Sequence, residues 1–169
     1  MKTLIACALG LMLCFSPMNT NIPDFNSTIH KGGFFHYSLF SEDLSKPVII
    51  KTHEDMHYIN KIMDNFRNDV YTHDQLLDLE SQVKQFYTRY TDKFFKDNAL
   101  VIALIDRGSG SVQYSVSDVK VDSKNHATIT INRKSPMIQT MDYIHWVLTL
   151  ETHHNIDSAE IVLVEQPCN

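Results

Sequence analysis

The chain has 169 residues, of which 43% are hydrophobic and 21% are charged, and its formal net charge is -5. This composition predicts one globular domain with a hydrophobic core, and it excludes a low-complexity chain. No basic stripe accompanies the acidic balance, so nucleic acid is not an expected partner.

The N-terminus has the pattern of a secretory signal peptide. Lys2 supplies a positive charge, and the apolar run Leu4–Phe15 has the length of a signal-peptide core but is too short to span a bilayer. We assign residues 1–16 to a cleaved signal peptide, and we expect a secreted or extracytoplasmic protein with no transmembrane span in the mature chain. Leu13 stands before Cys14, where a lipoprotein needs a small residue, so lipidation is not expected.

Residues 17–33 are rich in proline, asparagine, serine, threonine and glycine, which predicts a flexible, exposed leader. A single domain then covers residues 34–169. Cys168 is its only cysteine, so no internal disulfide can form and the fold must depend on its core. Two short strands are expected at the start of this domain, at Phe34–Phe40 and Pro47–Lys51.

Two amphipathic helices are expected next. Thr52 opens the first, and Asp55 occupies a capping-box position three residues later. Its apolar residues recur at helical spacing: Met56, Ile59, Ile62, Met63 and Phe66. The second begins at Thr72, where Gln75 completes another capping box. Its apolar face contains Leu76, Leu79, Val83, Phe86, Tyr87 and Tyr90.

The stretch Phe94–Ser111 separates this helical half from a half that is rich in strand patterns. Asp97-Asn98 predicts a turn, and the β-branched apolar run Ala99–Ile105 predicts a strand buried on both faces. Gly108-Ser109-Gly110 predicts a tight reversal, with Val112–Val121 as the partner strand.

Three more strands complete the expected fold: Ala127–Asn132, Tyr143–Glu151 and Ser158–Glu165. Turn residues separate them, as in the cluster Asp122–Asn125. We therefore predict an α+β fold in which an antiparallel sheet of about five to seven strands, curled or sandwich-like, packs against two helices.

The motif His53-Glu54-Asp55-Met56-His57 matches the HExxH pattern of zinc peptidases. On a helix this spacing places His53 and His57 on one face, with Glu54 as general base and Glu80 as the tempting third ligand. However, Asp55 places a charge inside the motif, and acidic residues are favoured in a first helical turn without any metal. We therefore favour a solvated helix start and keep a small zinc metallopeptidase as an alternative.

The turn after the central strand carries the candidate ligand-binding residues Arg107, Ser109 and Ser111, which place a cation beside two hydroxyls. A glycine-serine turn is more often structural than functional. The chain has no phosphate-binding glycine loop, no cysteine pair and no dinucleotide fingerprint, so no cofactor and no catalytic residues are assigned.

Part of the chain resembles small exported bacterial proteins related to the C-terminal domain of the protease-complex subunit PrcB. Three segments carry the resemblance: Phe94–Ser111, the two strands that follow it, and the region with Pro136, Thr140-Met141-Asp142 and Trp146. It covers roughly residues 50–152. It implies an exported domain of this fold and transfers no catalytic residue. At the hairpin, Arg107–Ser111 replaces the Gly-Gly-aromatic turn of that domain.

We therefore expect a secreted, non-enzymatic and monomeric binding domain whose partner is an extracytoplasmic protein. Binding is expected at the Arg107–Ser111 hairpin or at a sheet edge. Besides the zinc peptidase, a regulator or inhibitor of an extracytoplasmic protease is a second alternative, based on analogy of fold alone.

Overall fold

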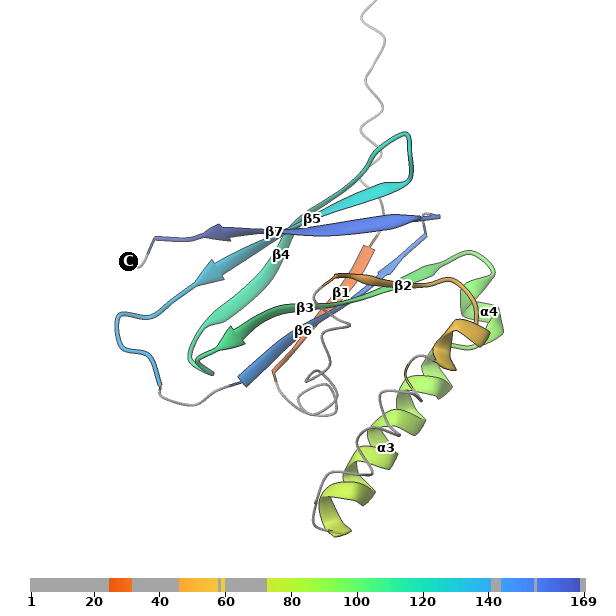
Figure 1. Cartoon of the computed structure of the whole chain (residues 1–169), viewed down its shortest axis with the longest axis horizontal. Helices are drawn as coiled ribbons and strands as arrows, with labels where there is room; N and C mark the ends of the chain where they lie inside the picture. The colour runs from red at the N-terminus through yellow and green to blue at the C-terminus, as the bar shows by residue number, and fades with distance from the viewer. Residues whose placement is uncertain are drawn as a thin grey trace, which may run out of the picture.

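The structure is a computed structural model that describes residues 25–31, 46–57, 59, 73–140, 144–153 and 155–167. It confirms the predicted α+β class, with seven strands in two sheets and two α-helices among these residues (Figure 1). The predicted signal peptide, the strand at Phe34–Phe40, the helix cap at Thr72 and the side chain of Arg107 lie outside the described part.

The four-stranded sheet has the order β1-β6-β3-β2 and is antiparallel throughout. Its strands are β1 (Phe25–Lys31), β2 (Val48–Ile50), β3 (Ala99–Gly108) and β6 (Ile144–Thr152). The strands β3 and β6 form its centre, and both are buried over most of their length. Their near-continuous apolar sequences are typical of strands that are covered on both faces.

The three-stranded sheet has the order β4-β5-β7. Its strands are β4 (Gln113–Val121), β5 (His126–Lys134) and β7 (Ser158–Glu165). β4 and β5 form an antiparallel hairpin, whereas β5 and β7 run parallel. β5 and β7 can run parallel because the chain between them crosses to the four-stranded sheet, where it forms β6.

Two hydrophobic cores organise the molecule in layers. Between the sheets, side chains such as Val101, Ile129 and Leu148 are fully buried. On the opposite face of the four-stranded sheet, α3 (His73–Arg89) and the short α4 (Asp92–Phe95) pack on a second core. Figure 1 shows the helices on one side of this sheet and the three-stranded sheet on the other. The four-stranded sheet is therefore the middle layer.

The predicted pairing of Ala99–Ile105 with Val112–Val121 is wrong. A turn does form, with Val112 N donating to Ser109 O at 3.2 Å, but it carries the chain from β3 in one sheet to β4 in the other. The hydrophobic patterns of β3 and β4 explain why the two strands belong to different sheets. β3 is apolar on both faces and fits the middle layer, whereas β4 alternates polar and apolar residues and fits a layer with one solvated face.

The flexible leader predicted for residues 17–33 is wrong over Phe25–Lys31. These residues form β1, which pairs antiparallel with Trp146–Thr152 of β6. Phe25 and Ile29 pack against the core between the sheets, while Asn26 and Thr28 alternate with them. Ser27 lies on the same face as Phe25 and Ile29 but is polar, so the sequence pattern for a strand is weak here. Pairing with β6 therefore determines that this segment forms a strand.

The predicted capping box at Thr52 is present. Asp55 N donates to Thr52 Oγ1 at 3.1 Å, and Thr52 N donates to Asp55 Oδ2 at 3.0 Å. The first turn, Glu54–Met56, is a 3₁₀ helix, and the continuation of the expected helix beyond residue 59 is not described. None of the described helices has both the length and the apolar character that crossing a bilayer requires.

Candidate functional site

The two serines of the predicted hairpin site meet in the structure, but they bond to neighbouring parts of the fold. Ser109 Oγ lies 2.7 Å from Ser111 Oγ and 2.8 Å from Thr140 Oγ1. Thr140 N donates to Ser111 Oγ at 3.2 Å, and Trp146 Nε1 donates to Ser109 O at 3.4 Å. These bonds fasten the turn after β3 to the loop that precedes β6. Only the backbone of Arg107 is described, opposite His145 of β6.

The two histidines of the HExxH motif also contact backbone groups. His53 Nδ1 lies 3.0 Å from Tyr90 O, and His57 Nδ1 lies 2.8 Å from Glu54 O. A carbonyl oxygen only accepts, so in both rings Nδ1 is the donor. Over the described ranges, no three His, Cys, Asp or Glu side chains are grouped so that they could hold a metal ion, and Glu80 joins the two histidines in no such group.

A polar cluster, which sequence reasoning missed, joins the two sheets beside a β-bulge in β3. The register of β3 against β6 shifts between Leu104 and Asp106, so Asp106 pairs with Trp146 and faces the three-stranded sheet. There it accepts a hydrogen bond from the Tyr114 hydroxyl. Arg133 Nε donates to Tyr114 Oη at 3.2 Å and lies 3.5 Å from Asp106 Oδ2.

Alkaline pH is expected to destabilise the protein through Tyr114. Burial, followed by the hydrogen bond to Asp106, raises the pKa of Tyr114 from 10.0 to about 12. The folded state therefore holds this proton more tightly than the unfolded chain, and the resulting stability is complete below pH 10 and lost as pH rises through about 12. For a shielded group this pKa difference corresponds to about 2.7 kcal/mol, and solvent screening of this half-exposed side chain lowers the expected effect to about 1 kcal/mol.

The measurement is urea unfolding of the parent protein and Tyr114→Phe at about pH 9 and about pH 11.5, which bracket the ionisation of an unfolded tyrosine. The parent should lose more stability than the variant between the two pH values. Equal losses would show that Tyr114 does not carry this proton linkage.

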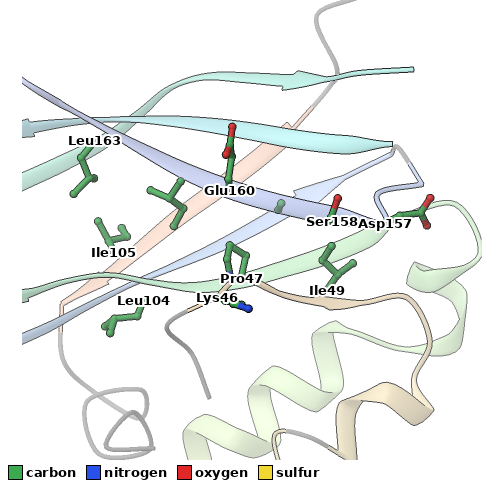
Figure 2. Close-up of a pocket in the computed structure, with 11 residues that line it drawn as sticks. Lys46, Pro47, Ile49, Leu104, Ile105, Asp157, Ser158, Glu160 and Leu163 are labelled. Carbon is green, nitrogen blue, oxygen red and sulfur yellow. The ribbon is translucent and has the colours of Figure 1, made fainter. Parts of the chain in front are cut away.

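A groove of about 730 Å³ runs between the edge strands β7 and β2 on the open side of the sandwich. Ile161 and Leu163 line it from β7, and Ile49, Leu104 and Ile105 line it from β2 and β3. Figure 2 shows Leu163 of β7 above Ile105 of β3, with Asp157, Ser158 and Glu160 toward the beginning of β7. Among the residues that the structure describes, β2 pairs only with Leu100–Ile102, so the groove continues beside β3 past the last residue of that pairing.

The β7 strand presents an open edge to this groove, since within the described ranges it pairs only with β5. Gln166 N donates to Arg133 O at 2.8 Å, and backbone directions alternate along a strand. The even-numbered residues of β7 therefore direct their N–H and C=O groups toward β5. Those of Ala159, Ile161, Leu163 and Glu165 point toward the open edge.

The acidic side chains of β7 are held by neighbouring residues. Arg133 Nη1 donates to Glu165 Oε1 at 2.6 Å, and Thr128 Oγ1 donates to Glu160 Oε1 at 3.1 Å. At the mouth of the groove, Lys51 Nζ lies 2.5 Å from Asp157 Oδ1, and this bond, followed by one from Asn125, holds the pKa of Asp157 below its usual value. Asp157 and Glu165 are therefore paired with cations, and apolar side chains outnumber Lys46, Asp157 and Glu160 in the lining of the groove.

Exposed apolar side chains continue along β7. Val162, Leu163 and Val164 are 41%, 42% and 39% exposed. Sequence reasoning recognised this segment as a strand but did not single out these residues, although its run of apolar residues on both faces was the available signal. We compared the chain with models of known protein families, with curated proteins and with solved structures, and none of the three comparisons found a match.

Proposed function

We propose that this protein is a non-enzymatic interaction domain that binds an extended segment of another polypeptide by strand addition to β7. The open β7 edge beside an apolar groove is the observation that supports it. In this mode the backbone hydrogen bonds provide affinity, and pockets for alternate side chains provide specificity.

The geometry of β7 supplies both requirements from the same residues. Ile161 and Leu163 direct their backbone groups toward the open edge and also line the groove. An added strand would hydrogen-bond to these two residues, and every second side chain of that strand would enter the groove. The walls formed by Ile49 and Ile105 favour apolar side chains at those positions.

We infer that the partner is an extracytoplasmic protein, because the N-terminal residues have the pattern of a signal peptide. The hairpin serines are a weaker candidate for the binding surface than the β7 edge, because their hydroxyls already bond to Thr140 and to each other. Replacing both serines is expected to alter the turn more than it alters binding.

The test uses a fluorescent eight-residue peptide of alternating valine and threonine with a lysine at each end, and its binding is followed by fluorescence anisotropy. Leu163→Asp places a charge in the groove and is expected to weaken binding about tenfold or more. Ser115→Asp is the matched control, because it makes the same charge change at an exposed position on β4, the opposite edge of the same sheet.

Methylating the peptide amides along both edges of its backbone should abolish binding, since strand addition needs those donors. If the unmethylated peptide does not bind protein that sedimentation shows to be monomeric, or if both substitutions weaken its binding equally, addition of a peptide strand at β7 is excluded.

A further inference from the structure

We propose that the extended segment on the β7 edge is the β7 strand of a second copy of this chain, paired antiparallel about a two-fold axis at Val162. This inference rests on the proposed function, because it uses the same edge, and it identifies the partner. The two three-stranded sheets would then form one continuous six-stranded sheet. The expectation of a monomer came from the sequence alone, where an open edge is not visible.

The middle of β7 lacks the features by which proteins protect edge strands. Such strands usually carry lysine, proline, a bulge or an inward charge. Residues Ile161–Val164 contain none of these, and their pairing with β5 continues without a register shift. The exposed side chains of Val162, Leu163 and Val164 are apolar and, for the two valines, strongly strand-forming. This edge is therefore suited to pairing with another strand.

Backbone direction restricts the possible registers. In an antiparallel pair, residues with edge-directed backbone groups must face each other, and facing side chains lie on the same side of the sheet. The odd-numbered residues of β7 must therefore face odd-numbered residues of the second copy. A two-fold axis then passes through Ile161, Val162 or Leu163.

Charge and length select the axis at Val162. An axis at Ile161 places Asp157 opposite Glu165, and like charges directly opposite are destabilising. An axis at Leu163 leaves Ala159 outside the paired region. With the axis at Val162, the pairing covers the strand from Ser158 onward and opposes each glutamate with an uncharged residue: Glu160 with Val164 and Glu165 with Ala159.

The same register fills the apolar groove. Ile161 of one copy faces Leu163 of the other, and both side chains lie on the groove side of the sheet. Val162 faces its own counterpart on the solvated side. Association would therefore cover apolar surface on both faces of β7 while its acidic side chains keep the contacts with Arg133 and Thr128.

Disulfide cross-linking tests this register in a background in which Cys7, Cys14 and Cys168 are replaced by serine. Facing residues of a non-hydrogen-bonded pair have Cα atoms about 4.5 Å apart, which suits a disulfide, so Val162→Cys should form covalent dimers about tenfold faster than a control cysteine. Ser115→Cys is that control, because it is exposed on the opposite edge of the same sheet. Equal rates for the two variants would overturn the proposal.

Sedimentation equilibrium tests the association without cross-linking. The parent protein should approach twice the monomer mass as its concentration rises, while Val162→Lys stays monomeric because two lysines would face each other at the axis. Ser115→Lys should associate like the parent, and circular dichroism of each variant verifies its fold. A parent protein that remains monomeric at about 100 μM, a concentration well above micromolar affinity, would overturn the dimer. Binding of the valine-threonine peptide in that case would leave the proposed function intact.

Discussion

Substituting Val164 with proline is expected to lower the free energy of unfolding by about 3 kcal/mol, whereas proline at Leu163 should cost about 1 kcal/mol. The two residues are neighbours with similar exposure, 39% and 42%, so burial does not distinguish them. The two residues differ in the direction of their backbone groups. The hydrogen bond from Gln166 N to Arg133 O indicates, by alternation along the strand, that the N–H of Val164 points toward β5 and that of Leu163 toward the open edge.

The physical reason for the difference is the missing N–H of proline. At position 164 the substitution removes a donor from the β5–β7 ladder and leaves a carbonyl oxygen of β5 without its partner. At position 163 the lost N–H faced the open edge, where proline is tolerated. Urea unfolding of both variants measures the contrast, and it should be made at low protein concentration so that association does not contribute. Equal destabilisation would show that the deduced backbone directions of β7 are wrong.

Removing the carboxylate of Glu151 is expected to destabilise the protein by about 3 kcal/mol, because three partners lose their acceptor together. Glu151 Oε1 accepts from the Tyr90 hydroxyl at 2.8 Å and pairs with Arg89 Nη2 at 2.6 Å. Its other oxygen accepts from Asn26 Nδ2 at 3.1 Å. The carboxylate thus joins α3, β1 and β6, and Glu151→Ala would leave the hydroxyl of buried Tyr90 without this acceptor.

Glu160→Ala is the matched control for this variant, since it removes an exposed carboxylate of another strand and is expected to change stability by at most about 0.5 kcal/mol. A double-mutant cycle of Glu151→Ala with Tyr90→Phe should give a coupling of about 1–2 kcal/mol, because each single variant removes the same hydrogen bond. The measurement is thermal or urea unfolding at neutral pH. If Glu151→Ala is no more destabilising than Glu160→Ala, the carboxylate does not hold the helix to the sheet.

Several features could be read from the sequence because they depend on residues close together in the chain. The apolar run from Ala99 becomes β3, since a short β-branched segment without polar positions fits only a strand that is covered on both faces. The reciprocal bonds of Thr52 and Asp55 form because three residues of sequence bring the two groups together. The turn at Asp122–Asn125 follows from a carboxylate that accepts local N–H groups and from Asn125, which adopts a positive φ of 58°.

The polar clusters depend on distant residues and were not predictable in this way. Asp106 reaches Tyr114 and Arg133 because one extra residue in β3 changes the face on which its side chain lies. A bulge of this kind leaves no clear mark in the hydrophobic pattern. Glu151 meets Asn26, which lies 125 residues away in the sequence.

The sequence by itself therefore determined the α+β class, the positions of most strands and the local caps and turns, because hydrophobic periodicity and short-range hydrogen bonds act within a few residues. Only the tertiary structure decided that β4 joins the sheet of β5, that Phe25–Lys31 becomes a strand, and that β7 is an edge strand. Strand order depends on which surfaces remain uncovered after all the strands have packed. For the same reason, the β7 edge and its groove, which support the proposed function, became visible only in the assembled fold.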